Sequence, residues 1–202
     1  RIFRTETGFT IVDGYEAHPV IEITWFGAWA FAQHYALRLP TEQEWEKAAR
    51  GTDERAYPWG SQPPAGDLAN LADSNLPYKD SDYGIDDSYL FVAPVGSYPN
   101  GASFYGALDM AGNVWEWTES ERDDGHTRYA ILKSGSYWVA QGSLWYVTSG
   151  AQPCNAHQKI LLMYPGLDRC ATIGVRCVRD ANPNVANSIP KKLPETRSES
   201  NV

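Results

Sequence analysis

The chain has 202 residues, of which 43% are hydrophobic and 13% aromatic, enough for the buried core of one large domain or two small ones. Its formal net charge of −8 argues against a nucleic-acid-binding surface, because such surfaces gather lysine and arginine. The sequence contains no run of about 20 apolar residues and so predicts no membrane span. Eight tryptophans and twelve tyrosines predict an interior built on large rings whose polar ends need partners.

Two segments have the three-and-four spacing of apolar residues that is typical of an amphipathic helix. The first lies within residues 24–36, with its apolar stripe at Trp25, Ala28, Trp29, Ala32 and Ala36. The second lies within residues 39–51, where Thr41 and Glu44 have the spacing of a capping box and Gly51 provides a stop.

The remaining sequence predicts strands and ordered loops. Residues 52–120 are rich in Gly, Pro, Asn and Asp and lack a helical period, which predicts irregular backbone held by aromatic rings. Residues 128–180 show the alternation expected of strands, for example at Tyr129, Ile131, Ile173 and Val175. We therefore predict an α+β domain with two helices, small antiparallel sheets and much irregular loop over residues 1–180, followed by an extended polar tail at 181–202.

Three cysteines, Cys154, Cys170 and Cys177, lie in the last quarter of the chain. They allow at most one intramolecular disulfide, and buried thiols that pack as small hydrophobic groups are the alternative. The four histidines are too scattered to predict a zinc site. Because the chain does not begin with Met, we expect a mature product or a fragment. The sequence leaves the compartment open, and we favour an extracytoplasmic or cell-surface location.

The segment "DMAGNVWEW" places Glu116 between Trp115 and Trp117, after Asp109 and a Gly-Asn turn. A carboxylate that leaves water for a tryptophan-lined wall requires a cation or a set of hydrogen-bond donors. Calcium takes carboxylate, amide and backbone oxygens from such loops, whereas the simpler alternative is a hydrogen bond to a nearby turn. The residues alone favour the hydrogen bond. A second oxygen-rich group offers Asn70, Asp86 and Asp87, with a solvated acidic loop as its alternative.

Six segments in order resemble the formylglycine-generating enzyme family, also called the sulfatase-modifying-factor family. They are "HPVIEITWFGAWAFAQHYALRLPTEQEWEKAARG", "YPWG", "LANLADS", "VAPVGSYPNGASFYGALDMAGNVWEWTES", "LKSGSYW" and "IGVRCVRD", which together span roughly residues 10–180. The resemblance implies a variant of the C-type lectin fold with bound calcium. It places one ion at Asn70, Asp87 and Tyr89, and a second at Asp109, Gly112, Val114 and Glu116.

Catalytic residues of the family are replaced in this sequence. Active members resemble a copper-dependent oxidase that holds the metal by two thiolates, five residues apart, after a "GGSY" or "GGSW" motif. Thiolates are soft ligands that select Cu(I). Aligned on "KSGSYWVAQGSLWYV", these two positions are Val139 and Leu144, neither of which binds copper. The cysteines that form disulfides in some members correspond to Ala32 and Ala49.

Other branches of the resembled family use the fold differently. Sulfoxide synthases of the ergothioneine type need an iron site with three histidines, largely from a preceding helical domain, and a pyoverdine-maturation branch works without the cysteine pair. Variable proteins of diversity-generating retroelements display changing side chains on the same fold. Residues 137–171 have the mixed aromatic and small polar composition of such a surface. Its predicted ligand-binding residues are Tyr137, Trp138, Trp145, Tyr146, His157 and Tyr164. The alternative is a long loop that packs "ILLMY" into the core or against a neighbouring domain.

Two functional hypotheses follow. The first is a non-catalytic ligand- or protein-binding scaffold domain, stabilised by calcium, with residues 137–171 as its binding surface. Its partner would be a protein or another surface ligand, within a larger assembly, and not nucleic acid. The second is an oxidase or maturation enzyme with an altered metal site that uses Cys154, Cys170 or His157.

Overall fold

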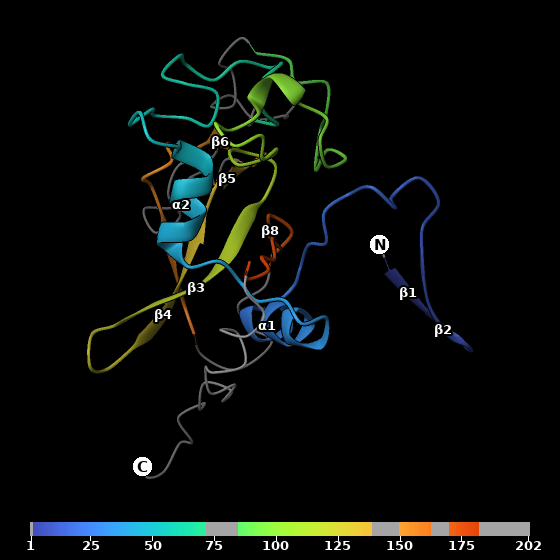
Figure 1. Ribbon diagram of the computed structural model, residues 1–202. Helices are drawn as coiled ribbons and strands as arrows, with labels where there is room; N and C mark the ends of the chain where they lie inside the picture. Colours follow the sequence, from blue (N-terminus) through green and yellow to red (C-terminus); the bar gives the residue numbers. More distant parts are fainter. Residues whose placement is uncertain (1, 72–84, 139–149, 163–169, 182–202) are drawn as a thin grey trace.

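A four-stranded sheet forms the centre of the computed structural model, which describes residues 2–71, 85–138, 150–162 and 170–181 (Figure 1). In spatial order its strands are β7 (Gln158–Leu161), β4 (Arg128–Lys133), β3 (Trp115–Asp123) and β8 (Ile173–Val175). The pairs β7–β4 and β4–β3 are antiparallel, whereas β8 runs parallel to β3. The predicted α+β class is confirmed, and the sheet is mixed rather than wholly antiparallel.

The first predicted helix is confirmed as α1 (Trp25–His34). Thr24 caps it, because the Thr24 side chain accepts a hydrogen bond of 3.0 Å from the Gly27 amide. Trp25, Ala28 and Ala32 are buried as the spacing predicts. The stripe ends one turn early, however, since Ala36 lies beyond the helix, is exposed and has a positive φ of 53°.

The second predicted helix is confirmed as α2 (Glu42–Arg50), which lies along the sheet beside β3 and β4 (Figure 1). The capping box forms as predicted: the Thr41 hydroxyl accepts from the Glu44 amide, and the Glu44 carboxylate accepts from the Thr41 amide at 2.9 Å. Gly51 ends the helix with a φ of 72°. The same Glu44 carboxylate also pairs with Arg38 at 2.6 Å, and this contact lowers the pKa of Glu44 to about 2.

Replacing Thr41 by alanine tests this helix start. The substitution removes the hydroxyl that accepts the Glu44 amide, so we expect the free energy of unfolding to fall by about 1 kcal/mol. Chemical denaturation monitored by tryptophan fluorescence measures the change. Thr41→Ser keeps the hydroxyl and should stay within about 0.5 kcal/mol of the wild type. Equal losses in the two variants would show that the hydroxyl does not cap α2.

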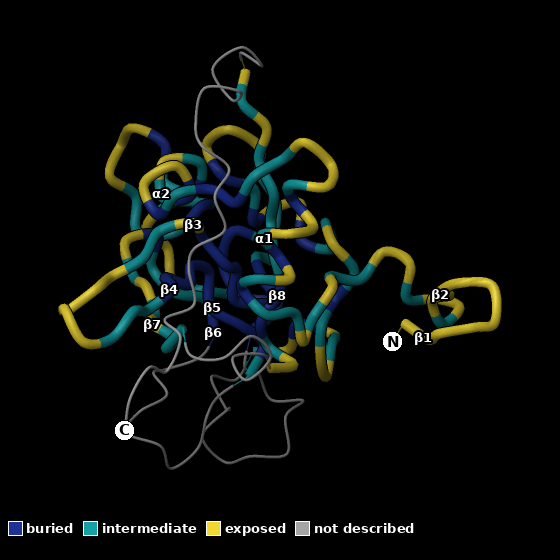
Figure 2. Tube along the Cα trace, turned by 90° about the horizontal axis from the view of Figure 1, so that it is seen from below, coloured by how far each residue is buried: buried dark blue, intermediate teal, exposed yellow. Residues whose placement is uncertain are grey.

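Tryptophan rings fill the space between the helices and the sheet, and their polar ends are satisfied as the composition predicts. Trp25 donates from Nε1 to the Thr118 carbonyl at 2.7 Å, and Trp117 donates to the Ile23 carbonyl at 2.8 Å. Figure 2 shows the buried segments gathered at the centre of the body, with exposed loops around them. The hydrogen bonds of Trp25 and Trp117 tie α1 and the segment before it to β3.

The strand β3 corrects the prediction that residues 52–120 are irregular throughout. It begins at Trp115, and Trp115, Glu116, Trp117 and Thr118 are all buried. A strand that is covered on both faces lacks the alternation of apolar and polar residues by which strands are recognised. The Gly-Asn turn before β3 and the tryptophans within it therefore resembled loop sequence.

Shorter elements complete the described chain. An N-terminal hairpin joins β1 (Ile2–Thr5) to β2 (Gly8–Ile11), a 3-10 turn spans Pro99–Gly101, and β5 (Gly135–Ser136) pairs with β6 (Gly150–Ala151). Within the described ranges, neither helix has the length and apolar character needed to cross a bilayer. The predicted tail lies outside the described residues apart from its first position.

Candidate functional site

The carboxylate of Glu116 is held by an arginine and a tryptophan from distant parts of the chain. Arg176 donates from Nε to Oε2 at 2.9 Å and from Nη2 to Oε1 at 2.8 Å, and Trp45 donates from Nε1 to Oε2 at 2.6 Å. Glu116 is only 4% exposed, so the bidentate contact with Arg176 compensates a buried charge. The negative charge of Glu116 raises the pKa of Arg176 further, which keeps the guanidinium charged.

Asp109 lies beside this pair at the edge of a cavity of about 430 Å³. Its carboxylate accepts a hydrogen bond of 2.7 Å from the Gly96 amide, and burial raises its pKa. Arg176 donates to the Leu108 carbonyl at 2.8 Å, which fixes the loop that carries Asp109. The cavity has apolar walls from Pro19, Val95, Leu108, Val114 and Val175, with Asp109, Glu116 and Arg176 as its charged lining.

Gly112 lets two loops touch at this site. Its φ is +79°, and a Cβ atom there would lie 2.2 Å from the backbone oxygen of Asn70. Only glycine permits that approach in this conformation. The Gly112 carbonyl accepts from the Ser134 hydroxyl at 3.0 Å, which also ties the loop to the end of β4. The turn before β3 is thereby fixed against the loop that contains Asn70.

A second polar group gathers around Asn70 and Asp87, both fully or almost fully buried. The Asp87 carboxylate accepts from the Leu71 amide at 2.5 Å and from the Tyr89 amide at 2.9 Å. The amide nitrogen of Asn70 donates to the Phe91 carbonyl at 2.8 Å. Its oxygen, Oδ1, is buried and has no hydrogen-bond partner among the described residues.

Asn113 links these loops, and sequence reasoning missed it. Its side-chain oxygen accepts from Asn70 Nδ2 and from the Ala93 amide, both at 3.0 Å, while its Nδ2 donates to the Ala93 carbonyl at 3.2 Å. Its backbone amide donates to the Asn70 carbonyl at 2.9 Å, and its carbonyl accepts from the Tyr137 amide at 3.1 Å. Asparagine tolerates the φ of 58° found here. In the sequence, the only sign of this role is the asparagine that follows glycine in "GNVWEW", a residue type that tolerates a positive φ.

The two predicted calcium sites differ in how well their residues fit an ion. A buried amide oxygen without a partner, next to a buried carboxylate, suits calcium, which prefers such oxygen ligands. Asn70 and Asp87 therefore have the chemistry that the first ion requires, while Tyr89 stays a prediction. At the second site, Arg176 already neutralises Glu116 and would lie against any cation placed there. The set Asp109, Gly112, Val114 and Glu116 stays a prediction.

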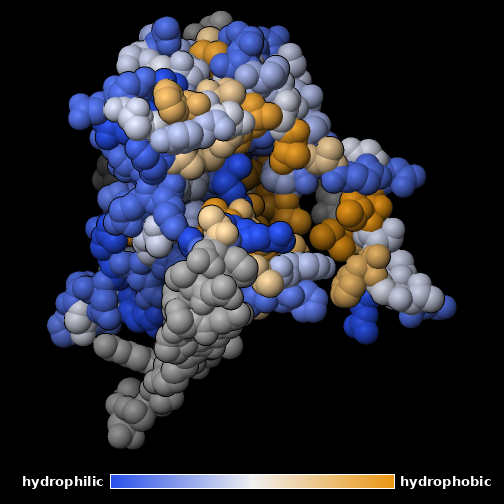
Figure 3. Space-filling model, in the orientation of Figure 1, coloured by the Kyte–Doolittle hydropathy of each residue, from blue (hydrophilic) through white to orange (hydrophobic). Residues whose placement is uncertain are grey.

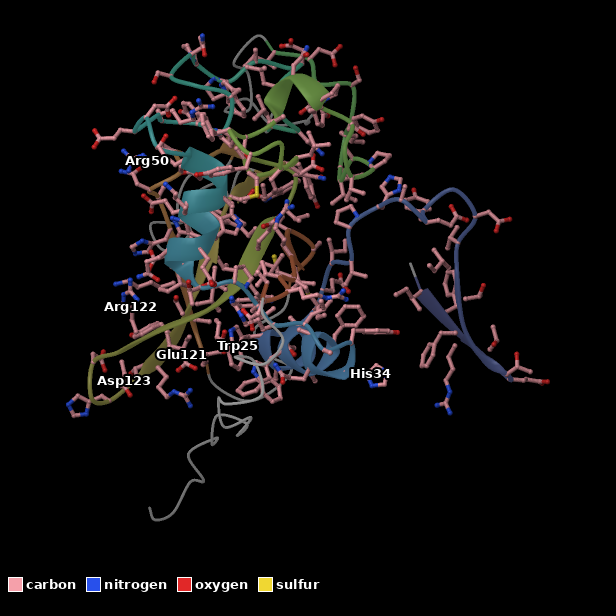
Figure 4. The ribbon with its side chains drawn as sticks, in the orientation of Figure 1. Trp25, His34, Arg50, Glu121, Arg122 and Asp123 are labelled. Carbon is pink, nitrogen blue, oxygen red and sulfur yellow. The ribbon has the colours of Figure 1, made fainter. Side chains whose placement is uncertain are left out.

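Another charged group lies at the beginning of α2 (Figure 4). The buried carboxylate of Glu42 lies 3.0 Å from His157 Nδ1 and accepts from Arg122 Nη2 at 2.5 Å. Figure 4 shows Arg122 beside this end of the helix and Arg50 at the other end. The predicted ligand-binding residue His157 is exposed, and its ring lies against the Glu42 carboxylate.

The predicted display surface is only partly within the described residues. Tyr137 is buried rather than displayed: it is 6% exposed, and its ring contacts Phe91 edge-on at a centroid distance of 6.1 Å. Its position directly after β5 directs the ring into the core, which corrects the expectation for this residue. Trp138 is half-buried. Trp145, Tyr146 and Tyr164 lie outside the described residues, as do Val139 and Leu144.

All three cysteines are free thiols. Cys154 is buried, and burial raises its pKa to about 11, so it is a neutral thiol at pH 7. Cys170 is exposed, with its Sγ 2.8 Å from the Thr172 hydroxyl, and Cys177 is half-buried. In the described part of the chain, no three His, Cys, Asp or Glu side chains form a group that could hold a metal.

The mixed sheet, the two helices and the long ordered loops define an α+β domain of the formylglycine-generating-enzyme type, a C-type-lectin-like fold. The chain belongs to the family described as the sulfatase-modifying factor enzyme 1-like domain, whose sequence profile matches residues 3–181.

Relatives of this chain have different names and are considerably longer. Hercynine oxygenase from Mycolicibacterium smegmatis is 41% identical over 149 residues, which cover 65% of this chain and 31% of the relative. Formylglycine-generating enzyme from Mycobacterium tuberculosis is 43% identical over 106 residues, which cover 52% of this chain and 34% of the relative. Inactive C-alpha-formylglycine-generating enzyme 2 from Bos taurus is 38% identical over 130 residues, covering 62% and 40%. The chain thus spans about a third of the length of the first two relatives.

Two solved structures share the fold. PvdO from Pseudomonas aeruginosa gives a TM-score of 0.60 at 20% identity, covering 81% of this chain and 62% of that one. Treponema denticola variable protein 1 gives a TM-score of 0.58 at 19% identity, and the match covers 85% of this chain and 74% of that one. At these identities the likeness concerns the fold alone.

Proposed function

We propose that this chain is a non-catalytic binding or scaffold domain that uses a calcium-stabilised sulfatase-modifying-factor fold to hold a protein or another surface ligand. The observation that carries the proposal is the pair Val139 and Leu144, which stand where the resembled oxidases require two thiolates. An aliphatic side chain offers no lone pair to copper. The name of the inactive relative from Bos taurus is consistent with a member of this family that does not catalyse the oxidation.

Cys154 is a poor replacement for the missing copper thiolates. Cys154 is buried, and its raised pKa disfavours the thiolate that copper needs. Cys170 is exposed and Cys177 is half-buried. Together with the replaced pair, the burial of Cys154 favours binding over oxidation.

Calcium at Asn70 and Asp87 would give the domain its rigidity. The ion would satisfy the orphaned Asn70 Oδ1 and balance the buried charge of Asp87. It would join the loop at residue 70 to the loop at residues 87–91. Because Asn113 bonds to Asn70 and to Tyr137, the start of the proposed binding region depends on this junction.

Calcium should raise the melting temperature of the purified chain, and a chelator should lower it. An ion that binds only the folded state stabilises it by about 2.7 kcal/mol when its free concentration is about 100 times its Kd. Asp87→Asn removes a charged ligand, so the melting curves of that variant with calcium and with chelator should nearly coincide. Differential scanning fluorimetry provides the measurement.

Asp86→Asn is the matched control, because it makes the same change of charge at the exposed neighbouring position. It should keep the full calcium-dependent shift. A wild-type melting curve that chelator leaves unchanged would remove calcium from the proposal. Equal loss of the shift in both variants would indicate a nonspecific effect of charge.

An oxidase or maturation enzyme with an altered metal site is the second candidate. It is favoured by the 41% identity to a protein named hercynine oxygenase. His157 and Cys170 are its accessible ligands among the described residues, since both are at least partly exposed. Metal analysis after loading with iron or copper tests it. One tightly bound redox ion per chain, lost in His157→Ala or Cys170→Ser, would support this candidate over the first.

A further inference from the structure

The N-terminal hairpin of β1 and β2 stands apart from the rest of the described chain (Figure 1). The strands pair antiparallel, and every residue of both strands is exposed. A two-stranded hairpin alone is at best marginally stable in water. This one therefore needs a surface to pack against.

One face of the hairpin is apolar and carries a single charge. Residues directly opposite each other in an antiparallel pair share a face, and Ile2 is opposite Ile11 while Arg4 is opposite Phe9. Phe9 is 76% exposed, the largest value among the exposed large hydrophobic residues of the described chain. Thr10 lies on the other face, opposite Phe3.

The cavity beside Asp109 offers a surface of complementary chemistry. Its apolar wall continues outward at Val95, which is 58% exposed, and the nearby Val20 and Tyr105 are also exposed. Figure 3 shows hydrophobic residues on the face of the body beside the hairpin and on the hairpin itself. With Asp109 and Glu116 against Arg176, the charged lining carries one negative charge in excess. Arg4 would complement it.

The linker, residues 12–19, leads from the body to the hairpin, which stands apart from the body in Figure 1. The Val95 amide donates to the Ala17 carbonyl at 2.8 Å, which fixes the base of the linker at the cavity rim. Two successive turns follow, with the amides of His18 and Tyr15 donating to the carbonyls of Tyr15 and Val12, each at 3.1 Å. These bonds set the course of the linker, and a second copy can meet the hairpin where that course places it.

We propose that two copies of this chain exchange hairpins about a two-fold axis, so that the Ile2, Phe9 and Ile11 face of each hairpin packs into the partner's cavity. Arg4 then approaches the excess negative charge at Asp109. Each linker starts at the rim of its own cavity, because Pro19 lines the wall. If the linkers of the two copies pass side by side, each hairpin reaches the cavity of the partner copy. The same two surfaces then meet twice, as a two-fold symmetric interface requires.

Light scattering coupled to size-exclusion chromatography tests the assembly. The wild-type chain should elute with twice its mass of 22.5 kDa over a wide concentration range. Phe9→Glu buries a charge in the apolar contact and should give the monomer. Thr10→Glu makes the same change of charge on the other face and should remain dimeric. A monomeric wild type, or a dimer that Phe9→Glu leaves intact, overturns the proposal.

Cross-linking identifies what fills the cavity. In a Cys170→Ser background, a Phe9→Cys variant is mixed with a Val95→Cys variant and the mixture is oxidised. Because each chain carries only one of the two new thiols, a disulfide between them can form only between two chains. We expect a covalent dimer from this mixture and much less from Thr10→Cys mixed with Val95→Cys. If the double variant Phe9→Cys, Val95→Cys instead closes a disulfide within one monomeric chain, the hairpin covers its own cavity and the exchange is refuted.

Discussion

Replacing Arg176 by methionine is expected to lower the free energy of unfolding by about 3 kcal/mol, because it leaves the buried Glu116 carboxylate without its cation. Trp45 would still donate to Glu116, but one neutral donor does not balance a charge that is only 4% exposed. The Leu108 carbonyl would also lose its donor, so the loop that carries Asp109 should loosen. Urea denaturation gives the change in stability directly.

The double variant Arg176→Met, Glu116→Gln is the control for this expectation. It removes both charges together, so it should be more stable than Arg176→Met alone, as replacing a whole buried ion pair often costs little. If Arg176→Met lowers stability by less than about 1 kcal/mol, Glu116 must be balanced by another group.

Replacing Asn113 by alanine is expected to lower the free energy of unfolding by about 4 kcal/mol. The substitution removes three buried hydrogen bonds, two accepted and one donated, and leaves their partners on Asn70 and Ala93 unsatisfied. Alanine is also unfavourable at the positive φ of this residue, by roughly 1 kcal/mol. Denaturant unfolding at equilibrium measures the loss.

Two variants separate the causes of that loss. Asn113→Gly removes the same side chain but accepts the positive φ, so it should be about 1 kcal/mol more stable than Asn113→Ala. Asn100→Ala removes an exposed asparagine whose amide contacts Asp67, and it should change stability by less than about 0.5 kcal/mol. A loss at Asn113 no larger than that at Asn100 would contradict the role of Asn113 in joining the loops.

Local features were predictable from the sequence, and partners distant along the chain were not. The helices α1 and α2 carry their caps and apolar spacing within a dozen residues, so both were predicted. Glu116 was correctly expected to need a cation or donors. Its partner Arg176 is 60 positions away, however, and nothing in the local pattern indicates that β8 runs beside β3.

Burial explains the remaining differences. Tyr137 belongs to a segment with the composition of a display surface, but its position after β5 places it in the core. The burial of Lys133 was also not predicted: it is 0% exposed, 3.5 Å from Glu46 and 5.4 Å from the centre of the Trp45 ring. That burial lowers the pKa of Lys133. A lysine carries no local mark that distinguishes a buried position from a solvated one.

The absence of oxidase activity is the central claim, and the mass of a peptide tests it most directly. The purified chain is loaded with copper and incubated in air with a cysteine-containing sulfatase peptide, and the peptide is then weighed by mass spectrometry. We predict an unchanged cysteine, because Val139 and Leu144 cannot bind the metal that performs the oxidation. Conversion of that cysteine to an aldehyde would contradict the account.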